Sequence, residues 1–245
     1  MKKFFGTEFM EKTRCANLVP TNREKGLPQP PIELPVDGAV KLIHLPEPDL
    51  LVDKEINFLE LIELRTSVRQ YNQAKISLKD LSYLLWCTQG VKMITPTGNT
   101  TLRNVPSAGA RHAFETYLLI NQVEGLEPGL YRFLALEHSL IAVDLSEEIT
   151  AELTVAFMNQ KMIPTSSVTF IWTAVAERMT YAYGERAYRY LHLDAGHVCQ
   201  NLYLAAQTIN FGACAIAHFD DEKLNQTLKI DGENQFAIYA ASVGK

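Results

Sequence analysis

The stretch AYRYLHLDAGHVCQNLYLAAQTI, residues 187–209, is the longest helical pattern in this chain and decides how the other elements can be arranged. Apolar residues lie around much of its circumference, and the pattern stops near Gly212. A helix that is apolar on several sides has to be covered on several sides. We therefore expect other elements to pack on it, and a second copy of the chain to cover part of it.

Strand patterns occur on both sides of this helix in the sequence. Residues 168–175 (VTFIWTAV) are apolar almost throughout, which predicts a buried strand. Residues 129–134 and 139–143 form a hairpin pattern around Glu137 and His138. Further strands are predicted over residues 115–121, 213–219 and 236–243. Because strands and helices interleave without a regular β-α-β repeat, the expected class is α+β with an antiparallel or mixed sheet.

Shorter helices are predicted outside the long one. Residues 56–65 place apolar side chains at helical spacing. Ser77, with Asp80 three residues later, resembles a capping box and begins a helix that runs to Gly90. Further helices are predicted from Ser146 and from Asp220 to about Lys229, and a polar loop is predicted over residues 91–104.

Residues 1–55 differ from the rest of the chain in their proline content. Seven prolines between Pro20 and Pro48 interrupt any helical period, which predicts an extended N-terminal arm. Apolar residues between Leu34 and Leu45 favour an arm that lies across a surface, such as that of a partner subunit. A flexible leader is the alternative. Residues 56–245 would then form one domain.

The composition argues against several classes of protein. A net charge of −5 and a pI near 5.7 give no basic surface for nucleic acid. The four cysteines lie far apart without a C-x-x-C pair, which argues against a disulfide framework or a zinc site. No apolar run approaches the roughly 20 residues of a membrane span. No apolar signal region follows Lys2 and Lys3 either, so we expect a cytoplasmic protein without membrane contact.

Several common motifs are absent from the sequence: G-x-x-x-x-G-K-[ST], G-x-G-x-x-G, G-x-S-x-G and H-E-x-x-H. What remains are short segments suited to an anion and a flat polar ring. In Arg65-Thr66-Ser67-Val68-Arg69, two guanidinium groups and a hydroxyl on a short turn can surround a phosphate. A solvated helix end explains the same residues equally well, because cations are favoured there.

Two further groups of residues are candidates for a site. Residues 104–112 are mostly small, so a ligand can approach their backbone closely. Asp194 and His197 share one face of the long helix, with His192 nearby. A hydrogen-bonded structural pair explains them better than a metal site, because no further ligands are in evidence. No resident metal is expected.

Five segments occur in the order and spacing of the nitroreductase superfamily. They are R-T-S-V-R (65–69), P-S-A-G-A-R-H-A-F-E-T-Y (106–117), Y-G-E-R-A-Y-R-Y-L-H-L-D-A-G-H (183–197), G-A-C-A-I-A-H-F-D (212–220) and V-G-K (243–245). From about residue 56 the chain resembles this superfamily, and more narrowly its SagB/ThcOx-type dehydrogenase branch. The resemblance implies a nitroreductase-like fold, with a central, mostly antiparallel sheet flanked by helices, in an interlocked homodimer.

The resemblance also implies a tightly held FMN at the subunit interface. The residues that it assigns to the phosphate, the ribityl chain or the pyrimidine edge are Arg65, Thr66, Ser67 and Arg69. It assigns Pro106, Ser107 and Ala108 of the other subunit to the lining of the ring. Ala217 and His218 match the stretch whose backbone amides face the N5 and O4 side of the flavin. Gly244 and Lys245 match a C-terminal phosphate contact.

Tyr183 is the candidate catalytic residue. In members of the branch that oxidise azolines, a Lys-Tyr pair precedes the glycine, whereas this chain has Ala182-Tyr183-Gly184. Tyr183 can serve as a general acid or base without that lysine, or it can pack as an ordinary aromatic residue.

Three functions are compatible with these residues. The first is an FMN-dependent oxidoreductase that transfers a hydride between a small-molecule or peptide substrate and flavin N5. The second is an NAD(P)H-dependent nitro or quinone reductase. The third is a non-catalytic flavin-binding subunit of a biosynthetic complex.

Overall fold

The computed structural model describes residues 4–36, 38–48 and 57–245. Its centre is a seven-stranded sheet in the order β1-β6-β5-β4-β7-β9-β8, and each neighbouring pair is antiparallel. The strands are β1 (Ile43–His44), β4 (Phe114–Ile120), β5 (Gly129–Leu134), β6 (Ser139–Asp144), β7 (Val168–Val175), β8 (Gly212–Ile216) and β9 (Gln235–Gly244). The predicted α+β class with a mostly antiparallel sheet is confirmed.

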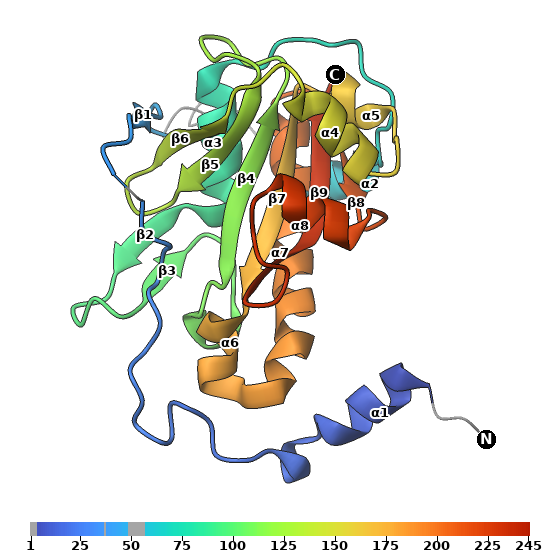
Figure 1. The fold of residues 1–245 in the computed structure, drawn as a ribbon. Coiled ribbons are helices and arrows are strands. Elements are labelled where there is room, and N and C mark those ends of the chain that lie inside the picture. Colours follow the sequence, from blue (N-terminus) through green and yellow to red (C-terminus); the bar gives the residue numbers. More distant parts are fainter. Residues whose placement is uncertain (1–3, 37, 49–56) are drawn as a thin grey trace.

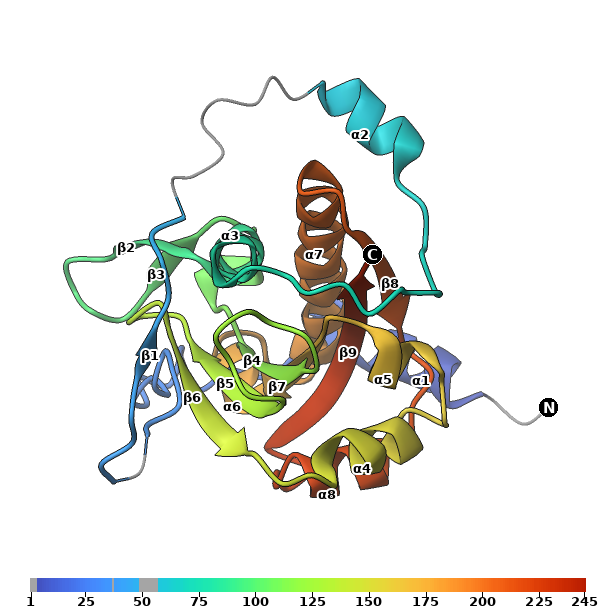
Figure 2. The same cartoon turned by 90° about the horizontal axis from the view of Figure 1, so that it is seen from above.

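Helices cover both faces of this sheet (Figures 1 and 2). One face carries α3 (Leu78–Gln89) and α7 (Ala187–Thr208), and the other carries α4 (Ile149–Ala156), α5 (Met162–Thr165) and α8 (Asp221–Thr227). Between β7 and α7 the chain forms α6 (Ala176–Tyr183) and a 3-10 turn, Gly184–Arg186. The sheet therefore separates two hydrophobic cores.

The central strand β7 contributes to both cores. Its alternate residues Phe170 and Trp172 pack in the core under α3 and α7, whereas Ile171 packs in the core under α4 and α8. Successive side chains of a strand point to opposite faces, so a strand covered on both sides is apolar at nearly every position. This explains the pattern at residues 168–175 from which the strand was predicted.

Two helix starts follow the predicted side-chain caps. Ser77 Oγ accepts a hydrogen bond from the Asp80 amide at the start of α3. Asp220 Oδ1 accepts one from the Lys223 amide at the start of α8. Each cap satisfies an amide that lacks a partner within the helix, which fixes where the helix begins.

The surface of α7 differs from the prediction on one side. Its buried side packs on the sheet and on α3, as expected. Its exposed side is largely small or polar and comprises His192, Leu193, Gly196, His197 and Gln200. The predicted pattern, apolar around much of the circumference, therefore does not extend to this side.

An apolar exposed surface lies instead on α2 (Phe58–Leu64), which precedes the segment at residues 65–69. Its exposed apolar side chains are Phe58, Leu59, Ile62 and Leu64. The predicted helix start at Ile56 and the boundary between residues 55 and 56 lie outside the described residues.

The predicted loop over residues 91–104 is a hairpin. Its strands β2 (Val91–Ile94) and β3 (Thr101–Arg103) pair antiparallel, and the Thr95 amide donates to the Thr100 carbonyl at 2.9 Å to close the turn. The strand predicted over residues 213–219 ends earlier, at Ile216.

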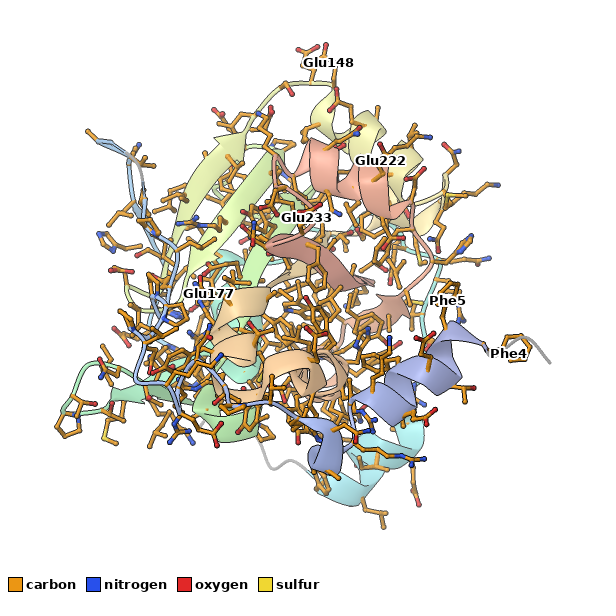
Figure 3. The ribbon with its side chains drawn as sticks, turned by 60° about the horizontal axis from the view of Figure 1, so that its bottom comes forward. Phe4, Phe5, Glu148, Glu177, Glu222 and Glu233 are labelled. Atoms are coloured by element: carbon orange, nitrogen blue, oxygen red, sulfur yellow. The ribbon has the colours of Figure 1, made fainter. Side chains whose placement is uncertain are left out.

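The N-terminal arm, which was predicted to be extended, begins with a helix, α1 (Phe5–Lys12). This helix lies before the first proline of the chain, so the prolines do not interrupt it. Phe4 and Phe5 project from it into solvent (Figure 3). After a 3-10 turn at Cys15–Asn17, the arm crosses the surface of its own chain, and β1 adds to the edge of the sheet beside β6.

Among the described helices, none has the length and apolar composition that a membrane crossing requires.

Candidate functional site

Residues 65–71 form an extended segment along the edge made by β8 and the end of β9. The Val68 amide donates to the Ala213 carbonyl at 3.0 Å, and the Asn72 amide donates to the Lys245 carbonyl at 2.6 Å. These backbone bonds bring the first predicted segment beside the C-terminal residues that were assigned to the same site.

Two glycines allow this close approach. A Cβ atom at Gly212 would lie 2.4 Å from Val68 Cγ2, and one at Gly244 would lie 2.5 Å from Tyr71 Cδ1. Side chains at these positions would therefore lift the segment from the sheet. Gly244 is buried beneath the segment, whereas Lys245 is exposed beside it.

Tyr203 of α7 connects the segment to β8. Its hydroxyl lies 2.9 Å from Ser67 Oγ and accepts a hydrogen bond from the Ala215 amide at 2.7 Å. The guanidinium carbon of Arg65 lies 5.4 Å from the centre of the Tyr203 ring, which is cation–π distance. Sequence reasoning missed this tyrosine, because no local motif distinguishes it from other aromatic residues of the helix.

Positive charge gathers at this edge. Arg65 is half-buried and Thr66 and Arg69 are exposed, and within the described part of the chain neither arginine forms an ion pair. Burial raises the pKa of Cys214, and the nearby Arg69 partly opposes that effect. The edge therefore presents guanidinium groups and hydroxyls without an acidic partner from the described residues, which suits an anionic ligand.

Ala217 and His218 follow β8 and are exposed. The His218 carbonyl accepts a hydrogen bond from Gln160 Nε2 at 2.7 Å. The hydrogen bonds found among the described residues leave the amides of Ala217 and His218 unused, whereas the amide of Ala215 is bound to Tyr203. Two backbone donors thus remain available at the exit of β8.

The second predicted segment, Pro106 to Ala108, lies against the N-terminal half of α7. The Ala108 amide lies 3.2 Å from Asp194 Oδ1 and 3.3 Å from Oδ2. Asp194 is 5% exposed, and burial raises its pKa above the usual value. Asp194 thus bonds this loop in place of the predicted partner His197, which is exposed.

The same loop continues into the 3-10 turn η2 (Ala108–Ala110). Tyr183, the last residue of α6, lies beside this turn. Gly109 has φ +57°, and a Cβ atom there would lie 2.4 Å from the Tyr183 hydroxyl. The Tyr183 ring also packs edge-on against Tyr190, with centroids 4.8 Å apart. The candidate catalytic hydroxyl and the ring-lining segment are therefore neighbours.

The predicted residues thus form two groups in one chain. One group surrounds Tyr203, and the other surrounds Asp194, nine positions earlier on the same helix. At a rise of 1.5 Å per residue, these positions are about 13 Å apart along the axis. The structure does not bring the two groups together within one protomer.

The fold and these positions agree with one family. Residues 62–245 match the model of the Nitroreductase family, to which the chain therefore belongs. Members of this family are generally flavin-dependent oxidoreductases. A nitroreductase-family protein of Methanocaldococcus jannaschii is 35% identical over 192 residues, which are 78% of this chain and 92% of that protein. The trifolitoxin-processing protein TfxB of Rhizobium leguminosarum bv. trifolii is 32% identical over 136 residues, or 53% of this chain and only 35% of that protein.

Solved structures share the nitroreductase fold. A nitroreductase-family protein of Ralstonia eutropha has a TM-score of 0.67 at 22% identity, with 89% of this chain and 98% of that chain covered. A chain of the E. coli microcin synthetase McbBCD complex with truncated pro-MccB17 bound has a TM-score of 0.61 at 19% identity, with 85% and 84% covered. A Desulfovibrio desulfuricans protein solved in complex with FMN has a TM-score of 0.54 at 16% identity, with 78% and 87% covered.

Proposed function

We propose that this chain is an FMN-dependent oxidoreductase that works as a homodimer. The observation that carries the proposal is the edge at residues 65–69, where two arginines without an acidic partner from the described residues adjoin the Ser67–Tyr203 hydroxyl pair. The family membership and the FMN complex of the Desulfovibrio relative support the choice of cofactor.

The donor set of this edge fits FMN. Guanidinium groups and hydroxyls suit a phosphate and a ribityl chain, and the unused amides of Ala217 and His218 suit the polar rim of a flavin ring. In this proposal Arg65, Thr66, Ser67, Arg69 and Lys245 bind the cofactor, and Gly244 keeps the segment close to the sheet.

The separation of the two groups along α7 supports a site shared between two chains. Pro106, Ser107 and Ala108 of one protomer would line the ring bound at residues 65–69 of its partner. Asp194 would hold that loop in place through the Ala108 amide.

We also propose the division into an arm over residues 1–55 and a flavin-binding domain over residues 56–245.

When bound, FMN supplies a hydride acceptor and donor at its N5 atom. The chain's own residues would orient the substrate and manage the proton. Tyr183 is half-buried next to Gly109, so its hydroxyl can hold or release a proton near a substrate that lies against the loop. Backbone amides at Ala217 and His218 would fix the position of the ring.

A SagB-type dehydrogenase acting on a small molecule or peptide is the finer form of this proposal. The similarity to the trifolitoxin-processing protein and to a chain of the microcin synthetase complex supports it. Because Ala182 replaces the lysine of the azoline-oxidising pattern, Tyr183 would act without a neighbouring ammonium group.

An NAD(P)H-dependent nitro or quinone reductase is the second candidate, favoured by the nitroreductase-family relative from Methanocaldococcus jannaschii. Anaerobic mixing of the flavin-loaded protein with NADPH separates the two. Rapid bleaching of the flavin absorbance identifies the reductase. A flavin that resists NAD(P)H but is bleached by an oxidisable small molecule or peptide identifies the dehydrogenase.

The cofactor itself is tested on the purified protein. We expect a yellow protein that releases close to one FMN per chain on denaturation. A colourless protein that cannot be reconstituted with FMN would contradict the proposed function.

A further inference from the structure

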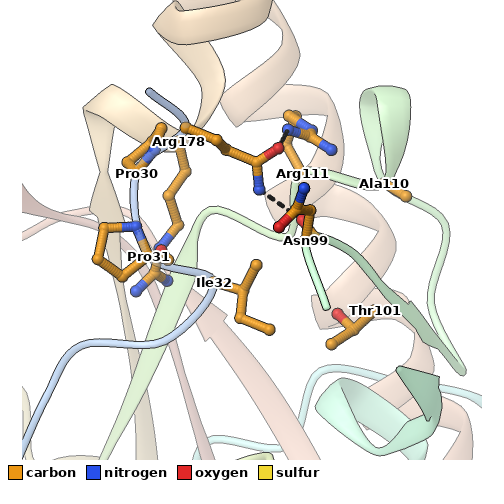
Figure 4. A pocket seen from close by; sticks show the side chains of 9 residues that line it. Pro30, Pro31, Ile32, Asn99, Thr101, Ala110, Arg111 and Arg178 are labelled. Carbon is orange, nitrogen blue, oxygen red and sulfur yellow. Dashed lines mark hydrogen bonds between the residues drawn. The ribbon is translucent and has the colours of Figure 1, made fainter. Parts of the chain in front are cut away.

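A small polar pocket lies under the N-terminal arm, next to the 3-10 turn at Ala108–Ala110. Figure 4 shows the arm residues Pro30 and Pro31 with Arg178 of α6 on one side, and Asn99, Thr101 and Arg111 across from them. Gln29, Ile32 and Ala110 complete the lining. The pocket has a volume of about 10 Å³, so only a small ligand fits into it.

Arg178, which lines this pocket, carries a buried donor without a partner among the described residues. Arg178 is 3% exposed; its Nε donates to the Pro31 carbonyl at 2.7 Å and its Nη2 to Glu115 at 2.5 Å. Its Nη1 is buried and has no hydrogen-bond partner among the residues that the structure describes. A buried guanidinium nitrogen without an acceptor is costly, so an acceptor in the pocket would stabilise the fold.

The charges around the pocket favour a negative acceptor. Arg178 is paired with Glu115, but Arg111 donates to neutral groups, namely the Gly109 carbonyl, Gln29 Oε1 and Thr100 Oγ1. Burial and the neighbouring Arg23 lower the pKa of Arg111. Among the described residues, the lining therefore carries an excess positive charge.

The acidic groups that the structure describes near the pocket do not cancel this excess. Glu115 is engaged by Arg178 and by the Leu34 amide. Glu33 lines the adjoining surface groove and accepts a hydrogen bond from the Leu136 amide. Burial raises the pKa of Glu33 to about 7, so it is only partly ionised at neutral pH.

We propose that this pocket binds one small monovalent anion of the size of chloride, held between Arg178 and Arg111 and enclosed by the arm. Both arginines also bind the arm directly, through Pro31 and Gln29. The anion would therefore fasten the arm to the domain. Further along, the arm contacts α6 near Tyr183, since the Arg23 amide donates to the Tyr181 carbonyl at 2.9 Å.

Bromide gives the direct test, because its anomalous scattering distinguishes it from water. In crystals grown with sodium bromide, we expect an anomalous peak in the pocket beside Arg178 Nη1. A water molecule at that position and no bromide would overturn the proposal.

Thermal unfolding tests the same site in solution. At constant ionic strength, with gluconate as the balancing anion that is too large for the pocket, chloride and bromide should raise Tm in a saturable manner. The halide should also slow the cleavage of the arm by trypsin. Stabilisation by formate but not by a halide would show that the site takes a carboxylate group instead.

The variant Arg111→Gln and its matched control Arg132→Gln complete the test. Arg132 is also a buried arginine that binds the arm, through the carbonyls of Leu34 and Pro35, but it does not line the pocket. The halide effect on Tm should be lost in Arg111→Gln and kept in Arg132→Gln. An equal halide effect in both variants would contradict the proposed site.

Discussion

The hydroxyl of Tyr203 lies 2.9 Å from the hydroxyl of Ser67, although the two residues are 136 positions apart in the sequence. The same tyrosine oxygen accepts the Ala215 amide. One side chain of α7 therefore sets the position of the arginine-bearing segment relative to β8.

Replacing Tyr203 by phenylalanine should weaken both the fold and the proposed cofactor site. The variant leaves the Ala215 amide without its acceptor, which costs about 1 to 3 kcal/mol of unfolding free energy. Affinity for FMN should fall as well, because Ser67 loses its fixed position. Urea unfolding of the apo-protein and flavin titration measure the two effects. Tyr83→Phe, which removes a hydroxyl bound to Thr208, is the control that should alter stability and leave FMN affinity unchanged.

Arg65→Ala and Arg69→Ala should each reduce FMN affinity. A charged hydrogen bond is worth about 1.5 to 3 kcal/mol, which corresponds to a roughly 10- to 150-fold loss. Lysine at either position should restore affinity in part, since it keeps the charge but loses the planar fork. Fluorescence quenching on titration of the apo-proteins gives the affinities, with the exposed Arg14→Ala as control. Wild-type affinity in both alanine variants would mean that FMN does not bind at this edge.

Gly109→Ala should disturb the loop beside Tyr183. The left-handed conformation at φ +57° costs an alanine about 1 to 2 kcal/mol. The added methyl would also lie 2.4 Å from the Tyr183 hydroxyl and displace it. Gly125→Ala has a similar cost at φ +78° with nothing within 4 Å, so it isolates the backbone effect. Chemical denaturation should show a larger loss for Gly109→Ala, and equal losses would refute the contact.

Glu33 should make the stability of the protein depend on pH. Its pKa in the folded state, about 7, lies above the ordinary value of 4.5. Between pH 4.5 and 7, the folded state therefore binds a proton at Glu33 that the unfolded state has released. Its contribution to stability is complete below about pH 4.5 and is lost as pH rises through 7. Burial lowers the pKa of His112 to about 3, which acts in the opposite direction, so the wild type must be compared with Glu33→Gln.

The difference in unfolding free energy between wild type and Glu33→Gln should therefore change steadily from about pH 5 to 8. The exposed Glu148, which projects from the surface in Figure 3, provides the control Glu148→Gln. A difference that is constant over this range would show that Glu33 has an ordinary pKa.

The wild-type protein should be a homodimer, and Leu59→Glu on α2 should weaken the dimer. The exposed apolar side chains of α2 form a surface that a monomer leaves in water. Sedimentation at low micromolar concentration measures the association, and Leu145→Glu is a control at another exposed leucine. A stable, flavin-loaded wild-type monomer would contradict the shared site.

The spacing of apolar residues identified those helices and strands that are buried on one or both sides within this chain. The strand at residues 168–175 was predicted with its observed bounds, because burial on both faces leaves an apolar residue at nearly every position. The hairpin β2–β3 was missed because its turn carries Pro96, Gly98 and Asn99, β2 is largely exposed, and the buried residues of β3 are polar. Helix α6 was missed because it continues directly from β7 without a side-chain cap.

The candidate site could be suggested from sequence where its residues are close together. Arg65, Ser67 and Arg69 form a short segment whose spacing fits an anion site and a solvated helix end equally well, and the resemblance to the nitroreductase superfamily favoured the anion site. Tyr203 and the bond between Asp194 and Ala108 depend on which side of α7 meets which loop. That information arises only when distant segments pack, and a single sequence does not contain it locally.

Asp194 and Tyr203 lie on one continuous helix, α7. The helix therefore fixes the distance between the loop at Ala108 and the segment at Ser67, which these two side chains contact. Inserting a single residue between the two positions would rotate everything after it by about 100° and turn the Tyr203 hydroxyl away from β8. The number of residues between the two positions therefore cannot change without breaking one of the two contacts.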